Sequence, residues 1–290
     1  MTPQTLRPRS SLVRALRTSE ERNAFMGFFE RQKNLYKRYW LWEAAWFCYS
    51  LVSVLSIGYL ASGLSALGLD GSHVDIRRTL LYLLVGSILW GYLSLVFFEV
   101  AFAIAWERWE GTIEYTFMAP VRRLTHLLGV CMFAVIYGLA RTGLVVIAVA
   151  LSFHLDLSHA DPAGALLVLA VSTIPVVGLG ILTSTLPLLS PEKGEQMTVA
   201  VQGVLLLISG VYYPVSVLPG PLRLAGALSP LTYTLSGMRA ALLEHAGPSQ
   251  LAPTLGVLLL MGVILIPGGT WVFSRAEARA KRLGLLKRNG

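Results

Sequence analysis

Six long stretches of the chain consist almost entirely of apolar residues. They cover residues 44–69, 79–106, 127–153, 165–189, 198–218 and 251–273. A helix needs about 20 mostly apolar residues to cross a bilayer, and each stretch is long enough. The runs are continuous rather than alternating at every second residue, which predicts helices and not the strands of a membrane barrel. We therefore expect an all-α integral membrane protein with six transmembrane helices.

The composition agrees with this fold and excludes two other classes of protein. Hydrophobic residues make up 54% of the 290 residues, charged residues make up 14%, and the mean hydropathy is +0.62. A soluble domain carries about 25% charged residues, and disordered chains are rich in charge. Cys48 and Cys131 both fall inside apolar stretches, so we expect two small buried hydrophobic side chains rather than a disulfide or a metal site.

Basic residues predict how the chain is oriented in the membrane. Of its 24 Lys and Arg residues, nine lie in 1–43, three in 107–126, one in 190–197 and six in 274–290. These segments share one side, which holds nineteen basic residues against four on the other side. The positive-inside rule then places both termini in the cytoplasm and the protein in the cell (inner) membrane.

The same pattern predicts the domain organisation. We expect a cytoplasmic N-terminal segment at 1–43, a six-span domain at 44–273 and a basic cytoplasmic tail at 274–290. The net charge of +8 comes from basic residues beside apolar runs. It does not form the solvated basic face that nucleic-acid binding requires, so no nucleic-acid partner is expected.

The N-terminal segment predicts an amphipathic helix in the cytoplasmic interface. Thr18–Glu21 matches a capping box that starts such a helix. Aromatic residues then recur at helical spacing at Phe25, Phe28, Phe29, Tyr36, Tyr39 and Trp40. A basic helix with an aromatic face is typical of the membrane interface. Two interpretations remain open, a simple membrane anchor and a lever that transmits motion from a cytoplasmic partner.

No segment carries a recognisable catalytic motif. None of the five lysines sits in a GxxxxGK[ST] phosphate loop, and neither HExxH nor GxSxG occurs. The segment HLDLSHAD places His154, Asp156, His159 and Asp161 close together. One short loop supplies no fixed coordination geometry, so we expect a solvated loop and no metal site. The chain is not expected to be an enzyme.

The segment WERWEGTIEYTFMAPVRR, residues 106–123, follows the second predicted span. Gly111 allows a bend, and Pro120 disfavours helix at the residue before it, so we expect a short helix over 112–118. Glutamates stand near its start and arginines follow its end, as the helix dipole favours. Such a helix across the ends of two spans would offer a surface for another protein.

A second unusual segment runs from residue 205 to 242. Gly210, Pro214 and Pro219 follow one another closely, so the fifth span should kink or stop near the outer surface. The apolar but proline-rich stretch that follows predicts short helices in the outer leaflet, between spans five and six. Tyr212 and Tyr213 fit either an interfacial aromatic belt or a lid over a cavity.

Two charges fall inside predicted spans, Glu99 in the second and Arg141 in the third. Charges at such depth are costly and often functional. In antiparallel helices these side chains lean toward each other, so an ion pair, direct or through water, is our first interpretation. Contact with a substrate and independent exposure are the alternatives.

Two segments resemble a known family. The loop ERWEGTIEYTFMAPVRR looks like that of ABC type-2 permeases, the membrane subunits of drug, lipid and polysaccharide exporters. The order Ile208-Ser-Gly-Val…Leu218-Pro219…Pro230-Leu-Thr-Tyr233…Arg239 is similar to that family's signature through the fifth span and the outer segment. We expect no fused nucleotide-binding domain, which some members of the family carry and others take from a separate subunit.

The resemblance implies a transport complex. It implies two six-span subunits, either two copies or two homologues, with two ABC ATPase subunits that bind the ATP and Mg. The segment 106–119 would be the coupling helix that docks on the ATPase. The implied docking residues are Glu107, Glu110, Gly111, Thr112, Glu114, Pro120 and Arg122. The implied outer gate contains Gly210, Tyr212, Tyr213, Pro214, Pro219, Pro230, Tyr233 and Arg239.

The resemblance also implies export of an amphipathic or lipid-like substrate such as a drug, antibiotic, lipid or glycan. The expected pathway wall is apolar and aromatic, with membrane lipids around it. Its candidate residues are Trp90, Phe97, Phe98, Val204 and Leu207, near the charged Glu99 and Arg141. Two other functions remain open, an ion-coupled carrier or channel and a membrane assembly protein without transport. Broken helices at mid-membrane would favour the carrier.

Overall fold

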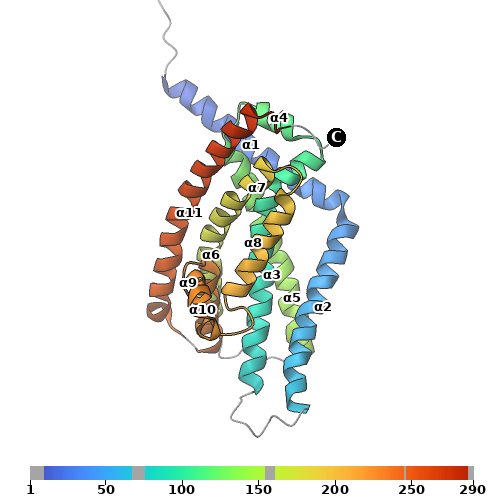
Figure 1. Cartoon of the computed structure of the whole chain (residues 1–290), viewed down its shortest axis with the longest axis vertical. Coiled ribbons are helices and arrows are strands. Elements are labelled where there is room, and N and C mark those ends of the chain that lie inside the picture. Colours follow the sequence, from blue (N-terminus) through green and yellow to red (C-terminus); the bar gives the residue numbers. More distant parts are fainter. Residues whose placement is uncertain (1–9, 67–75, 154–160, 245, 287–290) are drawn as a thin grey trace, which may run out of the picture.

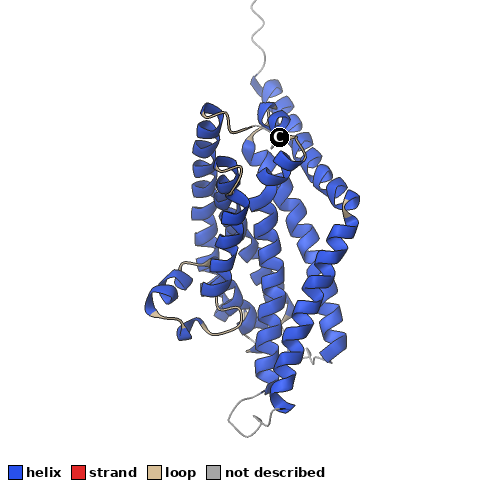
Figure 2. Ribbon diagram, turned by 45° about the vertical axis from the view of Figure 1, so that its right-hand side comes forward, coloured by secondary structure: helices blue, strands red, loops and turns tan. Residues whose placement is uncertain are grey.

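A computed structural model describes residues 10–66, 76–153, 161–244 and 246–286; side chains are described from residue 19 onward, except those of 64–66 and 76. This part of the chain is a bundle of helices joined by short loops, without strands (Figure 2). The all-α prediction is therefore confirmed.

Five apolar helical segments are long enough to cross a membrane. They are α2 (Trp40–Ala66), α3 (Ile76–Trp109), α5 (Arg123–Phe153), α6 (Pro162–Thr183) with its continuation α7 (Thr185–Leu189), and α11 (Pro248–Arg282). Each coincides with a predicted span. The helices begin with ordinary signals: the Asp161 side chain accepts hydrogen bonds from two backbone N–H groups of α6, and Pro162 and Pro248 occupy first turns.

The fifth predicted span is shorter than expected. It is α8 (Gly194–Ile208), which ends ten residues before the predicted limit at 218. The helix stops because Gly210 takes a left-handed conformation with φ +74°, which favours glycine and ends helices. Fifteen residues give a helix of about 22 Å, less than the roughly 30 Å of a bilayer core.

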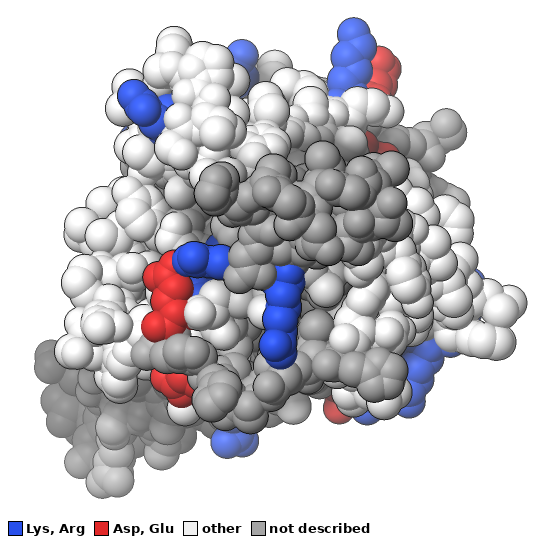
Figure 3. Space-filling model, turned by 90° about the horizontal axis from the view of Figure 1, so that it is seen from below, with Lys and Arg blue, Asp and Glu red and all other residues white. Residues whose placement is uncertain are grey.

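The bundle has two distinct ends (Figure 1). One end carries α1 (Ser10–Arg38), α4 (Ile113–Met118) and the C-terminal part of α11. We call it the α4 end; it is the end predicted to be cytoplasmic. The short elements η2 (Val215–Val217), α9 (Gly220–Ala227) and α10 (Pro230–Leu243) lie toward the opposite end, the α9 end. Seen from the α9 end, most of the described surface is neither acidic nor basic (Figure 3).

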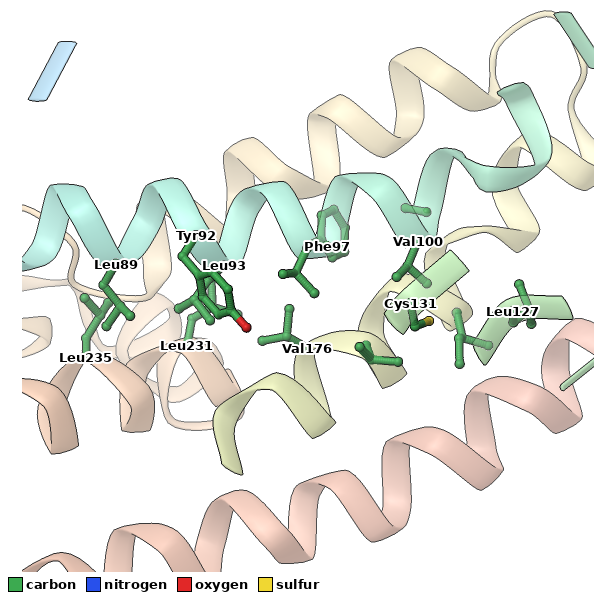
Figure 4. Close-up of a cluster of buried hydrophobic side chains, with 14 of the residues drawn as sticks. Leu89, Tyr92, Leu93, Phe97, Val100, Leu127, Cys131, Val176, Leu231 and Leu235 are labelled. Atoms are coloured by element: carbon green, nitrogen blue, oxygen red, sulfur yellow. The ribbon is translucent and has the colours of Figure 1, made fainter. Parts of the chain in front are cut away.

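Helix α3 forms the centre of the core. It packs against α2, α5, α6, α8 and α10, while α6 also packs along α11. The buried side chains drawn in Figure 4 come from α3, α5, α6 and α10, including Leu93, Cys131, Val176 and Leu231. Cys131 is thus buried as expected, whereas Cys48 is exposed on α2, and both thiols are free.

Helix α1 differs from the expectation in two respects. It begins at Ser10, so Thr18–Glu21 lies inside the helix and does not start it. Part of its aromatic face is covered by protein, because Phe29 and Tyr36 pack edge-on against Phe133 of α5, with ring centroids 5.8 and 4.8 Å apart, whereas Tyr39 and Trp40 are exposed. Protein contacts with α5 therefore hold α1 across the α4 end. The predicted loop residues His154, Asp156 and His159 lie outside the described residues.

Candidate functional site

The short helix α4 sits where the sequence predicts it. Helix α3 ends at Trp109, Gly111 makes the turn with φ +70°, and α4 covers Ile113–Met118. Ala119 is extended, as the residue before a proline prefers to be. The loop therefore presents one and a half helical turns at the end of the bundle.

A buried charge cluster holds the start of this loop. Only 1% of Glu107 is exposed. Arg31 of α1 reaches its Oε1 with Nη1 at 2.7 Å, and Nε2 of His126 on α5 lies 2.9 Å from the same oxygen. Nη2 of Arg31 also donates to the Thr112 hydroxyl at 3.0 Å. One carboxylate thus joins α1, α3 and α5, and the same arginine extends the cluster to the turn before α4.

Glu107 consequently does not fit the docking role that the sequence suggested. A carboxylate needs an accessible surface to contact another protein, and this one is enclosed by its own chain. Glu110 is partly engaged as well, because the Tyr39 hydroxyl donates to it at 3.0 Å and Arg38 lies 3.9 Å away. The local sequence carried no sign of these partners, since the three residues from the N-terminal part of the chain, Arg31, Arg38 and Tyr39, lie more than 70 residues away from the two glutamates.

The inner face of α4 is held by Arg123. Its Nη1 and Nη2 donate to the backbone carbonyls of Thr116 and Phe117, both at 2.6 Å. Its Nε donates to Glu277 of α11 at 3.0 Å, and the guanidinium lies 4.5 Å from the centre of the Phe117 ring. These bonds satisfy carbonyls at the C-terminal end of α4, which the helix itself leaves without partners. They also tie α4 to α5 and α11.

The outer face of α4 is left open. Tyr115 is 79% exposed and Met118 is 84% exposed. Glu114, Pro120 and Arg122 are exposed as well. Together with the exposed Trp109, these residues form what we call the α4 surface. Two large apolar side chains and a tyrosine on a solvated loop suit contact with another protein better than contact with water.

A second arginine, Arg108, connects further segments of the α4 end, and it was not singled out by the sequence. It is 2% exposed, and it donates to the carbonyls of Pro187 at 2.9 Å and of Leu285 at 3.0 Å. These acceptors belong to α7, which leads into the next loop of the α4 end, and to the segment after α11. The two loops and the C-terminal segment of this end are therefore joined through the residue beside Glu107.

At the α9 end, Arg239 of α10 caps α8. It donates to the carbonyls of Gly210 at 2.9 Å and Val211 at 2.7 Å, just past the end of α8. Its guanidinium also lies 3.5 Å from the centre of the Tyr82 ring. A cation is favoured at a helix C-terminus, where carbonyls lack partners. Two residues that the sequence singled out, Gly210 and Arg239, thus meet directly.

Close contact with α3 completes this cap. A Cβ atom on Gly86 would lie 2.2 Å from the carbonyl oxygen of Val211 and 2.8 Å from Nη2 of Arg239. Only glycine lets the end of α8 approach α3 this closely. Gly86 was not singled out by the sequence, because a lone glycine in an apolar run has no local signature.

The other candidate residues of this segment make backbone contacts. The Tyr213 hydroxyl donates to the Leu207 carbonyl at 2.6 Å, and the Tyr233 hydroxyl donates to the Ala227 carbonyl at 3.0 Å. Pro230 is buried in the first turn of α10. Pro214, Pro219 and Tyr212 are exposed. Tyr213 and Tyr233 thus stabilise the backbone of this segment through their hydroxyl groups. The exposed residues are the ones that a partner or lipid could contact.

Glu99 and Arg141 do not form the direct ion pair that was our first interpretation. Arg141 instead donates to the Trp46 carbonyl at 2.7 Å. Glu99 is buried, and its Oε2 has no hydrogen-bond partner among the described residues. A contact through water remains a prediction.

The expected pathway wall divides between the core and the surface. Phe97 of α3 is 2% exposed and lies in the hydrophobic core of the bundle (Figure 4), so it cannot line a surface of this chain. Phe98 stacks on Phe102, with ring centroids 3.9 Å apart. Val204 and Leu207 are exposed along α8 and Trp90 is half-buried, so these three remain candidates for the wall.

Comparison with known proteins agrees with this architecture. A sequence model of the family described as ABC-2 type transporter matches residues 24–243, which is most of the chain. A comparison with curated proteins gave no match. The matched region runs from α1 to the end of α10 and includes both α4 and the capped end of α8. The chain therefore belongs to the ABC-2 type transporter family, whose members are membrane components of ABC transporters.

Proposed function

We propose that this ABC transporter permease subunit works in an exporter that is powered by a separate pair of ATPase subunits. The cargo would be amphipathic or lipid-like, and a second permease subunit would complete the pathway. ATP and Mg would be bound by the ATPase subunits. The six apolar helices of this chain would carry the cargo, and the α4 surface would receive the movement.

The α4 surface is the observation that carries this proposal. Tyr115 and Met118 are almost fully exposed, although Ile113 and Phe117 of the same short helix are buried. A six-residue helix is too short to be stable alone, so contacts with the rest of the chain must keep its buried face in place. Its other face is exposed and is available to a partner protein. The buried face rests on Arg123, and a force on the open face would therefore pass to α5 and α11.

The sequence gives a second reason to expect an external energy source. No lysine lies in a phosphate-binding loop, so ATP would have to be bound and hydrolysed by another chain. The exposed carboxylate of Glu114 on the α4 surface would face a basic or polar position on that partner.

The direct experiment is co-purification of the permease with its ATPase. We expect Glu114→Lys to abolish co-purification because it reverses a charge at the contact. Met118→Asp should do the same because it would bury a new charge there. The melting temperature of the permease should not change, because both side chains are exposed. Glu30→Lys, at an exposed glutamate of α1, is the matched control and should bind normally. Normal ATPase binding by both α4 variants would refute the docking surface.

The direction of transport needs its own measurement. In vesicles whose α4 end faces outward, an exporter should accumulate a fluorescent amphiphile inside when ATP is added. The orientation can be read from Tyr115→Cys in a background without Cys48 and Cys131, where a membrane-impermeant maleimide should label only from the cytoplasmic side. Labelling from the opposite side would overturn the proposed topology.

A further inference from the structure

A half-open groove lies where α1 turns into α2 beside the end of α3. Four aromatic rings line it, those of Tyr36, Tyr39, Trp42 and Trp106, and Glu43 stands among them. Gln32 and Leu35 of α1 complete the lining. The groove lies at the α4 end of three helices, at the depth where tryptophan and tyrosine gather in membrane proteins. It adjoins the α4 surface, because the rings of Trp106 and Trp109 lie 5.5 Å apart, and it lies at the other end of the bundle from the capped end of α8.

The groove carries a negative charge that no basic residue of its lining neutralises. Glu43 is its only charged lining residue. The Oε2 atom of Glu43 accepts one hydrogen bond, from the Tyr137 hydroxyl at 2.9 Å. Two arginines lie nearby, and neither forms an ion pair with Glu43 among the described residues: Arg38 approaches Glu110 at 3.9 Å, and Arg141, which is within electrostatic range of Glu43, donates to the Trp46 carbonyl at 2.7 Å. A positive group in the groove would therefore meet a carboxylate that accepts one hydrogen bond and has no ion-pair partner among the described residues.

The aromatic walls favour the same charge. Ring faces attract cations, most strongly those of tryptophan, and several rings together recognise alkylated ammonium groups. Trp42 is exposed and Trp106 is half-buried, so both present surface to an occupant. The ring of Tyr39 has the Arg38 guanidinium 5.5 Å from its centre, so a cation–π contact already occurs at one of the lining residues. The lining thus combines a counter-charge with the surfaces that bind an organic cation.

A second carboxyl group lies behind the wall. Glu99 of α3 interacts with Tyr36 and is within electrostatic range of Glu43, and its Oε2 is buried without a partner. Burial and the adjacent carboxyl groups of Glu99 and Glu43 raise the pKa of the Tyr36 hydroxyl well above its ordinary value. That hydroxyl therefore stays protonated as a donor.

The groove continues into an apolar track suited to a hydrocarbon tail. Trp42, Trp46 and Tyr49 follow one another along one face of α2, with ring centroids 6.1 and 5.8 Å apart. All three are exposed, as are Val52 and Leu60 farther along the helix. A molecule with its head in the groove would lay its tail along this face, in the hydrocarbon of the bilayer.

We propose that this groove binds the ammonium head of an amphipathic organic cation, with Glu43 as the counter-charge and Trp42 and Trp106 as walls. The occupant would come from the leaflet at the α4 end. The inference rests on the proposed function in one respect, because it names the class of cargo; binding itself requires no ATPase.

The experiment measures binding of dodecyltrimethylammonium to the permease in nanodiscs of phosphatidylglycerol. We expect saturable binding, and a loss of at least about tenfold in affinity for Glu43→Gln, equivalent to about 1.4 kcal/mol. Glutamine can still accept the Tyr137 hydrogen bond, so the fold should be kept, which a melting curve would verify. Trp42→Leu and Trp106→Leu should each weaken binding several-fold. Glu30→Gln, at an exposed carboxylate of α1 outside the groove, should bind as the unmodified protein does.

A neutral probe separates recognition of charge from partition into lipid. The carbon analogue of the probe, in which a tert-butyl group replaces trimethylammonium, should not bind saturably. Nanodiscs of phosphatidylcholine distinguish the source of the ammonium group. If they compete with the probe through Glu43, the site takes a lipid head; if they do not, it takes a free amphiphile, and either result supports ammonium recognition. Equal binding of the neutral analogue, or unchanged affinity of Glu43→Gln, would overturn the proposal.

The two proposals can fail separately. If the ATPase co-purifies through α4 but the probe ignores Glu43, only the groove proposal is wrong. If the probe binds through Glu43 but no ATPase associates, the groove stands and the exporter proposal is wrong. In the complete complex, we expect the probe to stimulate ATP hydrolysis in a manner that Glu43→Gln weakens.

Discussion

Arginines bind backbone carbonyls at both ends of the molecule, but the two ends differ in their buried ion pairs. At the α4 end, buried carboxylates bind arginines from distant helices, as Glu107 does with Arg31 and Glu277 with Arg123. At the α9 end, Arg239 binds backbone carbonyls, and Ser209 pairs with Ser229 at 2.9 Å. The ion pair described there, Arg78 with Glu244 at 3.9 Å, is exposed.

This difference indicates which end is rigid. Breaking a buried ion pair leaves an uncompensated charge, so such a cluster holds its helices in one arrangement. A hydrogen bond from a hydroxyl to a carbonyl contributes only about 1 kcal/mol and can be exchanged for water. We infer that the helices of the α4 end are held together more firmly than the short elements of the α9 end.

The strongest test of this contrast is Glu107→Ala. It leaves Arg31 and His126 without their shared carboxylate. Removing one partner of a buried pair costs about 3–5 kcal/mol, and we expect the lower value because the Arg31 side chain is 26% exposed. The melting temperature should fall clearly, as should stimulation of the ATPase. Glu114→Ala, at an exposed carboxylate seven residues later, should melt normally. Equal melting of the two variants would contradict the buried cluster.

The next largest effect should come from Gly86→Ala at the α9 end. The added carbon would meet the Val211 carbonyl oxygen at 2.2 Å, so α8 must shift. Such overpacking costs about 2–3 kcal/mol. Gly91→Ala in the same helix is the control, because its nearest neighbour would be the Ser50 hydroxyl at 4.0 Å. Thermal melts of both variants in detergent measure the difference, and identical curves would show that the end of α8 is not seated on α3.

Arg239→Met should have a smaller effect of about 2 kcal/mol, since hydrogen bonds from a charged donor contribute about 1.5–3 kcal/mol. The carbonyls of Gly210 and Val211 would lose their donor, and hydrogen exchange should increase in the last turn of α8. Arg223→Met removes an exposed arginine of α9 and should change neither property. A protected α8 end in the Arg239 variant would show that other groups provide the cap.

The smallest effects come from a matched pair of hydroxyl deletions. Tyr233 donates to the Ala227 carbonyl and Tyr39 donates to the Glu110 carboxylate, both at 3.0 Å. A bond to a charged acceptor is roughly twice as strong as a neutral one. Tyr39→Phe should therefore destabilise by about 1 kcal/mol and Tyr233→Phe by about half of that. The reverse order in chemical denaturation would contradict the distinction drawn between the two ends.

The sequence was sufficient for the parts of the fold that depend on local composition. Hydropathy located each of the five long apolar helices, because a span must be apolar over its whole length. Gly111 and Pro120 located α4 to within one residue, since turn geometry is set by the residues that form it. The fifth span was placed too long, because its apolar composition continues past the point where Gly210 turns the backbone.

The buried contacts could not be predicted in this way. Glu107 looked like a surface residue because charged loops are usually solvated, and only the fold brings Arg31 and His126 to it. Glu99 and Arg141 have opposite charges and helices that lean together, yet a backbone carbonyl of α2 takes the arginine. Partners that are distant along the chain leave no periodic signal in it.

The early end of α8 has a consequence for the transport path that we propose. Helix α8 has only fifteen residues, so it does not extend over the full thickness of a bilayer core. The short helices α9 and α10 lie toward the end that α8 does not reach (Figure 1). A molecule moving along α8 would meet interfacial groups about 8 Å sooner than at a full-length helix. Under the proposed export function, the apolar part of the path beside α8 would therefore be shorter than at the full-length helices.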